Sequence, residues 1–223
     1  LRRRPMNRII DPLRMIGVPV AGEGGCAPLQ IGAAPRPLRA LEYRLPVASA
    51  QVKTCLLLAG LAAGGAAWLS EPGPSRDHTE RMLRAMGVSV ESGAAEGGYW
   101  TRLTPPEPLA LKPLRIDLPC DPSAAAFLIV AGLIVPGSQI RLRGVGMNPT
   151  RTGLLDTLIE MGAEIEIRDR DEQGGEPAAD LLVRHSPLRG ARAGRARGAH
   201  DRRISGFCAR RGLRRGADGR RRS

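Results

Sequence analysis

Hydrophobic positions recur with helical spacing in three similar stretches of the chain. In each stretch the apolar helix face is followed by a glycine suited to end a helix, and then by a short run of alternating apolar residues that is typical of a strand. The three stretches are "DPLRMIGVPV" (11–20), "RMLRAMGVSV" (81–90) and "DTLIEMGAEIEI" (156–167), with their glycines at positions 17, 87 and 162. The pattern predicts three helix–strand pairs at intervals of about 70 residues.

A second pattern, an almost wholly apolar helix followed by a strand, occurs twice. The copies are "CLLLAGLAAGGAAWLSEP" (55–72) and "AFLIVAGLIVPGSQIRLRGV" (126–145). Together the two patterns predict an α/β protein built from units of about 70 residues, each with two helices and several strands. The longest apolar run, residues 124–135, is shorter than the roughly 20 residues that cross a bilayer, so it predicts a buried helix. We find neither a signal peptide nor a membrane span in the sequence.

Small polar residues mark the expected helix starts. Ser49, Asp121 followed by Pro122, either Ser75 or Asp77, and Thr150 are each placed as N-caps ahead of an apolar helix. Asp77 and Glu80 have the spacing of a capping box, and His78 is expected to serve the same cap.

Two helix starts carry more polar side chains than capping requires. Gln51 follows Ser49, and Arg76 lies in "PSRDHTERML". Free N–H groups and the positive end of the helix dipole attract anions, and an arginine adds a bidentate phosphate donor. Capping alone would explain one such start, but several together favour a phosphorylated ligand.

Charge is distributed very unevenly along the chain. The formal net charge is +12, yet residues 189–223 contain 13 arginines and only two acidic residues, so the first 188 residues are nearly neutral. The four cysteines lie far apart without a C-x-x-C pair, and the chain has three histidines. Reduced thiols are therefore favoured over a metal site. Because the chain begins with Leu1 and not with Met, we expect it to be an internal piece of a longer protein.

Five motifs resemble the EPSP synthase (3-phosphoshikimate 1-carboxyvinyltransferase) family in order and spacing. They are "RRPMNRIIDPLRMIG", "PVASAQVKTCLLLAGL", "EPGPSRDHTERML", "DPSAAAFLIVAGLIVPGS" and "GMNPTRTGLLDTLIEMGA", which together extend over residues 1 to 190. The resemblance implies the two-domain enolpyruvyl transferase fold, an inside-out α/β barrel of βαβαββ repeats, present here in part. We expect residues 1–118 to be the substrate-binding part of the first-completed domain, with two repeats, and residues 119–190 to begin the returning second domain.

The resemblance also implies a reaction. The 5-hydroxyl of shikimate 3-phosphate adds to C2 of phosphoenolpyruvate, and phosphate is then eliminated, as a step of aromatic amino acid biosynthesis. It implies no metal and no organic cofactor, two small-molecule substrates, a cytoplasmic location, no membrane or specific nucleic-acid partner, and a monomeric full-length protein.

Site residues are carried over by matching motifs. Ser49, Ala50 and Gln51 match the family's "SAQ" that holds shikimate 3-phosphate, and Arg76 matches a basic residue at the phosphate end of that substrate. Arg4 matches the arginine that binds phosphoenolpyruvate, which Gln51 also reaches. We place the inter-domain hinge at Asp121, where Cys120 replaces the family's usual glycine and raises the question of the turn geometry.

The catalytic groups of the family are not found in this chain. The resemblance implies a lysine ahead of Leu1, an aspartate displaced into the codons of Arg202 and Arg203, and a glutamate beyond Ser223. We therefore expect a substrate-binding portion that has no carboxyvinyltransferase activity as written.

Several alternatives stay open. Arg4 could be a solvated arginine in a basic run, and Arg151 is as consistent with a helix start as with a ligand contact. Cys26 resembles the loop cysteine of UDP-N-acetylglucosamine 1-carboxyvinyltransferase, an alternative relative. In that enzyme the cysteine precedes an Arg-Pro pair, whereas here Arg4-Pro5 comes first, so we interpret Cys26 as incidental.

The arginine-rich tail offers the alternative of a basic nucleic-acid-binding protein. However, the tail has one aromatic residue, Phe207, and no helical or strand period. Codons permitted for residues 200–208, "HDRRISGFC", can be read one base later as Met-Ile-Asp-Glu-Tyr-Pro-Val-Phe-Ala, which resembles the family's next motif. We interpret the tail as an out-of-frame translation that begins near Gly190, and we expect residues 191–223 to lack packed structure.

Overall fold

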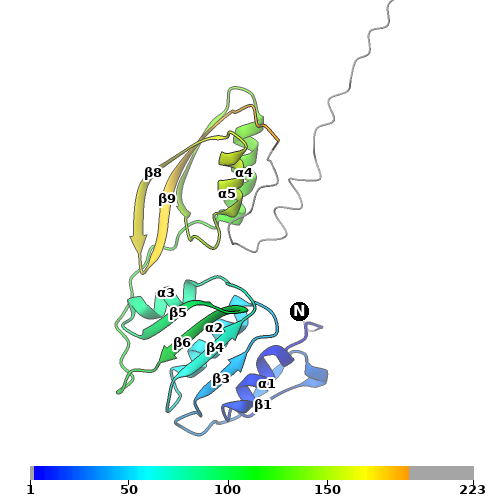
Figure 1. The fold of residues 1–223 in the computed structure, drawn as a ribbon, viewed down its shortest axis with the longest axis vertical. Coiled ribbons are helices and arrows are strands. Elements are labelled where there is room, and N and C mark those ends of the chain that lie inside the picture. Colours follow the sequence, from blue (N-terminus) through cyan, green and yellow to red (C-terminus); the bar gives the residue numbers. More distant parts are fainter. Residues whose placement is uncertain (1–2, 191–223) are drawn as a thin grey trace, which may run out of the picture.

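The computed structural model describes residues 3–190, so the expectations for the arginine-rich tail lie outside the described residues. The described part has two lobes, each a β-sheet with its own helices (Figure 1). We call the sheet β3–β6 with helices α1–α3 the first lobe, and the sheet β7–β9 with helices α4 and α5 the second lobe. None of the helices in residues 3–190 is long and apolar enough to cross a membrane.

The first lobe contains a four-stranded mixed sheet in the order β3-β4-β6-β5. Strand β3 runs parallel to β4, whereas β6 is antiparallel to both β4 and β5. A two-stranded hairpin, β1–β2, lies next to α1 and contains a short 3₁₀ turn, η1 (Glu23–Gly25). The bounds of the remaining elements are α1 (Asn7–Met15), β1 (Val20–Gly22), β2 (Leu29–Ile31), β3 (Leu41–Arg44), α2 (Ala50–Gly60), β4 (Ala67–Glu71), α3 (His78–Ala85), β5 (Ser89–Ala95) and β6 (Gly98–Thr104).

The core of the first lobe lies between the helices and one face of this sheet. Helix α2 is the central helix, because its Leu56 and Leu57 are fully buried. It approaches the sheet closely at Gly60, where an added Cβ would lie 2.9 Å from the Cβ of Ala67. The opposite face of the sheet carries Trp68 and Trp100, whose rings stack with centroids 4.9 Å apart.

The second lobe contains a three-stranded antiparallel sheet in the order β7-β9-β8, with α4 and α5 packed on one face (Figure 1). Its elements are α4 (Pro122–Ile134), β7 (Gln139–Gly146), α5 (Gly153–Glu160), β8 (Glu164–Gln173) and β9 (Glu176–Arg184). Its separate core is Ala125, Ile129, Leu133, Val145, Leu155, Leu158, Leu181 and Val183. The predicted division at residues 118 and 119 stays a prediction, although the two cores fall on either side of it.

The sequence patterns predicted most of these elements correctly. Gly17, Gly87 and Gly162 follow the ends of α1, α3 and α5 with φ of +96°, +88° and +88°, the left-handed conformation expected of a helix-ending glycine. Both apolar helices, α2 and α4, are followed by strands as predicted. The N-caps Ser49 and Asp121 are also confirmed, because their side chains accept hydrogen bonds from Val52 N and Ser123 N.

Two other predicted caps are wrong. Helix α5 begins at Gly153 with Thr152 in the N-cap position, and the Thr150 hydroxyl donates to Asn148 Oδ1 instead. Asp77 is the N-cap residue of α3, one of the two residues predicted for that position, but its side chain makes no cap hydrogen bond. The capping box with Glu80 does not form, because both carboxylates have partners from outside the helix start. Those partners, described below, outcompete the local hydrogen bonds that the sequence spacing allows.

Candidate anion-binding site

The N-terminus of α2 presents the predicted "SAQ" residues. Ser49 is extended and its Oγ accepts from Val52 N at 3.4 Å, so its side chain satisfies one of the four N–H groups that have no partner within the helix. The first turn of α2 contains no acidic residue to offset the positive end of the helix dipole. Ser49 and Ala50 are partly buried and Gln51 is exposed, so this helix start can receive an anion from solvent.

Arg8 of α1 is a neighbour of this site that the sequence analysis missed. Its Nη2 atom lies 3.4 Å from Oε1 of Gln51, across the contact between α1 and α2. With its carbonyl oxygen facing Arg8, Gln51 has its amide N–H₂ group available to donate elsewhere. Arg8 belongs to the quoted "RRPMNRIIDP" motif, but only the packing of α1 against α2 brings it to Gln51.

The second predicted helix start lies beside the first. Arg76 is exposed in the connection between β4 and α3, and the neighbouring Ser75 donates its hydroxyl hydrogen to Glu71 Oε1 at 3.0 Å. Helices α2 and α3 are also joined by a hydrogen bond of 2.6 Å between the hydroxyls of Thr54 and Thr79. The structure therefore brings together Ser49 and the Ser75–Arg76 segment.

A buried charge cluster lies behind these two helix starts. Lys53 is 1% exposed, and its Nζ lies 2.9 Å from Oε1 of Glu71 and 2.7 Å from Oε1 of Glu80, both of which are also buried. Burial by itself would lower the pKa of Lys53, but the carboxylates of Glu80 and Glu71 outweigh it and hold that pKa above its ordinary value. Lys53 thus stays positively charged inside the first lobe. This burial could not be recognised in the sequence, since a lysine near a helix start is usually solvated.

The predicted hinge residue lies at the start of the second lobe. Asp121 accepts hydrogen bonds from Ser123 N at 3.0 Å and from Arg151 Nη2 at 2.6 Å, and these contacts, the Ser123 bond first, lower the pKa of its carboxyl group. Arg151 therefore supports a helix start, the first of its two predicted roles. Cys120 pairs with β7 through Gly144 O and Gly146 N, and its φ is negative, so the turn does not require the family's glycine.

No hydrogen bond or ion pair among residues 3–190 joins Arg4 or Asp121 to Ser49. Arg4 is exposed immediately before the bridge that pairs Pro5 with Cys26. The backbone contact between Met6 N and Gly25 O holds this segment against the β1–β2 hairpin. Their roles at the site therefore stay predictions.

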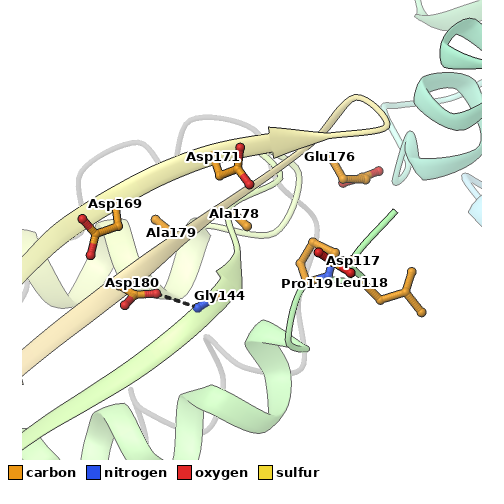
Figure 2. Close-up of a pocket in the computed structure, with 10 residues that line it drawn as sticks. All are labelled: Asp117, Leu118, Pro119, Gly144, Asp169, Asp171, Glu176, Ala178, Ala179 and Asp180. Atoms are coloured by element: carbon orange, nitrogen blue, oxygen red, sulfur yellow. Dashed lines mark hydrogen bonds between the residues drawn. The ribbon is translucent and has the colours of Figure 1, made fainter. Parts of the chain in front are cut away.

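A cavity of about 240 Å³ lies elsewhere, between the linker that precedes α4 and the β8–β9 hairpin (Figure 2). Five carboxylates line it, those of Asp117, Asp169, Asp171, Glu176 and Asp180. Asp180 accepts from Gly144 N at 2.8 Å, which together with Arg141 lowers the pKa of its carboxyl group. So many negative charges disfavour a phosphate ligand, and among residues 3–190 no group of acidic, histidine or cysteine side chains is arranged to hold a metal ion. The helix starts are therefore a better candidate for an anion site than this cavity.

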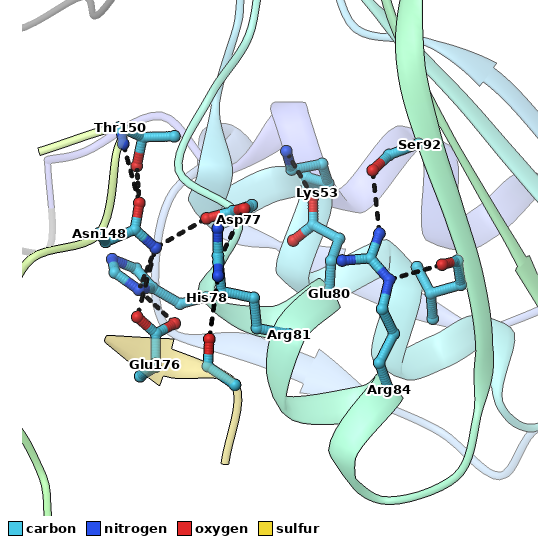
Figure 3. A network of polar contacts seen from close by, with 12 residues as sticks. Lys53, Asp77, His78, Glu80, Arg81, Arg84, Ser92, Asn148, Thr150 and Glu176 are labelled. Atoms are coloured by element: carbon cyan, nitrogen blue, oxygen red, sulfur yellow. Dashed lines mark hydrogen bonds and ion pairs between the residues drawn. The ribbon is translucent and has the colours of Figure 1, made fainter. Parts of the chain in front are cut away.

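Polar contacts join the residue after Arg76 to the second lobe (Figure 3). Asp77 Oδ1 accepts from Asn148 Nδ2 at 2.8 Å, and Arg81 links Asp77 to the backbone oxygen of Gly175. His78 Nδ1 lies 2.7 Å from Glu176 Oε1. The candidate site thus lies next to the junction of the two lobes.

The chain matches the family described as EPSP synthase (3-phosphoshikimate 1-carboxyvinyltransferase) over residues 1–193. It is 52% identical over 193 residues to the 3-phosphoshikimate 1-carboxyvinyltransferase of Methylorubrum populi, and 55% identical over 191 residues to that of Acidiphilium cryptum. Each match covers 85% of this chain but 42% of the relative, so the chain spans less than half the length of these curated relatives.

Solved structures show the same similarity. The EPSP synthase of Acinetobacter baumannii superimposes with a TM-score of 0.75 at 42% identity, over 85% of this chain and 42% of that one. The enolpyruvyl transferase NikO of Streptomyces tendae superimposes with a TM-score of 0.60 at 17% identity, over 85% and 44% of the two chains, and shows the fold alone. The α/β enolpyruvyl transferase fold predicted from the sequence is thereby confirmed. These similarities favour EPSP synthase over the alternative relative and over a nucleic-acid-binding protein.

Proposed function

The chain belongs to the EPSP synthase family, and on that premise we propose that it forms the part of the enzyme that binds shikimate 3-phosphate. The observation that carries the proposal is the meeting of two helix starts, with Ser49 and the Ser75–Arg76 segment tied to one carboxylate. The N–H groups at the N-terminus of α2 and an exposed arginine together suit a phosphate dianion. Because the first 188 residues are nearly neutral, the attraction of a phosphate depends on these local groups and not on the net charge of the whole surface.

Each predicted site residue has a role in the proposal. The hydroxyl of Ser49 and the free N–H groups of Ala50 and Gln51 donate to the phosphate or to the hydroxyls of shikimate 3-phosphate, and Arg76 forms a paired contact with the phosphate. Gln51, oriented by Arg8, and Arg4 bind phosphoenolpyruvate. Asp121 begins the lobe that closes over the two substrates and acts at the hinge between the domains that we predict at 1–118 and 119–190.

The reaction of the whole enzyme follows from these substrates. The 5-hydroxyl of shikimate 3-phosphate gives its proton to a base and bonds to C2 of phosphoenolpyruvate, while a proton is added to the methylene carbon. Loss of a proton from that carbon and departure of phosphate then give the enolpyruvyl ether. We propose that residues 3–190 bind and orient without supplying these proton transfers. We propose that the whole enzyme acts in the cytoplasm, because its phosphorylated substrates are dissolved there. We also propose that the full-length protein is a monomer.

Isothermal titration of the 223-residue chain with shikimate 3-phosphate and with shikimate tests this proposal. Because the anion contacts act on the phosphate, we expect shikimate to bind at least about tenfold more weakly, equivalent to about 1.4 kcal/mol. Equal binding of the two compounds, or no binding of either, would contradict the site. Incubation of the same chain with shikimate 3-phosphate and phosphoenolpyruvate should release no phosphate.

A further inference from the structure

We propose that Glu71 is a positioning residue that fixes the spacing of the two helix starts of the anion site. Glu71 is the last residue of β4 and is 4% exposed. Its Oε2 atom accepts from the backbone N–H of Ser49 at 3.3 Å, and its Oε1 atom accepts from the Ser75 hydroxyl at 3.0 Å. One buried carboxylate thus joins the N-cap residue of α2 to the residue that precedes Arg76. The inference rests on the proposed function, because positioning matters only if these starts share a ligand.

A carboxylate suits this position better than any neutral side chain. An ionised carboxylate is purely an acceptor with about four lone-pair sites, so it can accept from several donors at once. Three donors converge on Glu71, namely Ser49 N, Ser75 Oγ and Lys53 Nζ. Lys53 and Ser75 both donate to Oε1, so a glutamine in the same place would keep its oxygen there and direct its N–H₂ group toward Ser49 N. The replacement of Glu71 by Gln would therefore lose contacts while keeping the volume and the rotamer choices of the side chain.

Lys53 and Glu80 hold Glu71 in place from the interior. Lys53 Nζ lies between the two carboxylates, and Glu80 comes from α3, so the cluster connects α2, β4 and α3 (Figure 3 shows the contact between Lys53 and Glu80). Glu80 is 1% exposed, and its carboxylate makes no hydrogen bond with Ser49 or Ser75. Glu71 and Glu80 therefore both pair with Lys53, but of these two carboxylates only Glu71 also contacts Ser49 and Ser75.

This difference supplies a matched pair of variants, Glu71→Gln and Glu80→Gln. Each variant removes one carboxylate partner of Lys53, so an effect that both variants share reports the loss of electrostatic stabilisation of the buried Lys53 charge. An effect confined to Glu71→Gln reports the contacts with Ser49 and Ser75. A third variant, Ser75→Ala, removes one donor of Glu71 and leaves the buried charges unchanged, so it serves if Glu71→Gln does not fold.

Backbone amide exchange, measured residue by residue by NMR without ligand, is the first readout. We expect the Ser49 amide to exchange at least about tenfold faster in Glu71→Gln than in the parent, because its acceptor is altered, and to change less than about threefold in Glu80→Gln. Unchanged exchange at Ser49 in Glu71→Gln would overturn the inference. If that variant does not fold, unchanged exchange of residues 75–77 in Ser75→Ala would overturn it.

Titration with shikimate 3-phosphate is the second readout. If Glu71→Gln displaces Ser49 or the Ser75–Arg76 segment, binding of shikimate 3-phosphate should be about tenfold or more weaker in this variant. In Glu80→Gln, binding should weaken less than about threefold. Equal weakening in both variants would overturn positioning and leave only a structural role for the cluster. If the parent does not bind the compound but the Ser49 amide responds as expected, the proposed function fails while the link between the helix starts stands.

Discussion

His78 of α3 and Glu176 of β9 are paired across the two lobes, with 2.7 Å between Nδ1 and Oε1. The residues are 98 positions apart in the sequence, and they come from two lobes that have separate hydrophobic cores. Asn148 lies beside the pair, 3.4 Å from His78 Nδ1 and 3.3 Å from Glu176 Oε2. This small polar group therefore ties the segment that follows Arg76 to the tip of the β8–β9 hairpin.

Replacement of Glu176 by Ala should weaken this tie. His78 and Asn148 would lose a charged acceptor, for which we expect a decrease of about 1 to 2 kcal/mol in the free energy of unfolding, measured by urea denaturation with circular dichroism. Glu172→Ala is the control, because Glu172 is exposed on the same hairpin. It should change the unfolding free energy by less than about 0.5 kcal/mol. Equal effects of the two variants would show that the His78 contact contributes nothing.

Replacement of Lys53 by Met should strongly destabilise the first lobe. The change leaves Glu71 and Glu80 buried without their cation, which typically costs about 3 to 5 kcal/mol in the free energy of unfolding. Tryptophan fluorescence during urea denaturation measures this lobe directly, because both tryptophans, Trp68 and Trp100, lie in its sheet.

Lys112→Met is the matched control for this experiment. Lys112 is exposed in the segment that follows β6, and it is the other lysine of the chain. Its replacement should change the unfolding free energy by less than about 0.5 kcal/mol. A loss below about 1 kcal/mol in Lys53→Met would contradict the buried charge cluster.

Replacement of Asp121 by Ala should destabilise the second lobe in a pH-dependent manner. Loss of the N-cap of α4 should cost about 1 kcal/mol at pH 7. Since the pKa of Asp121 is lower in the folded chain than in the unfolded chain, its contribution is complete above about pH 3.9 and is lost as the pH falls through the folded value. The difference between parent and variant, measured by circular dichroism from pH 7 to pH 2, should therefore shrink in acid.

Asp121→Asn provides the comparison for this titration. Asparagine is also a good N-cap, so at pH 7 this variant should lie between the parent and Asp121→Ala in its free energy of unfolding. A difference between parent and Asp121→Ala that stays constant down to pH 2 would show that the charge of Asp121 has no part in the cap.

Sequence signals predicted those features of the fold that depend on interactions between residues close together in the sequence. Ser49 and Asp121 cap helices as expected because their acceptors lie two or three residues from the donors. Glycines 17, 87 and 162 end helices because the left-handed conformation favours glycine. The same signals failed at Asp77 and Glu80, since partners distant in the sequence, Asn148 and Lys53, take the carboxylates that a capping box would use.

The candidate site could be predicted only in part from the sequence. The sequence identified Ser49, Gln51 and Arg76 because these residues lie near expected helix starts, where more polar side chains occur than capping requires. Arg8, Glu71 and Lys53 were missed, because their importance depends on which elements pack together. A lysine within an apolar helix and a glutamate at a strand end have ordinary solvated explanations until the fold brings them into contact.

The affinity of the chain for shikimate 3-phosphate with and without Arg76 is the most direct test of the proposed function. Isothermal titration should show that Arg76→Ala binds about tenfold to a hundredfold more weakly than the parent, because one charged phosphate contact contributes about 1 to 3 kcal/mol. Arg102→Ala removes the same charge from the exposed face of β6, where Arg102 pairs with Trp68, and should leave the affinity unchanged. Equal affinities of Arg76→Ala and the parent would contradict the assignment of the site.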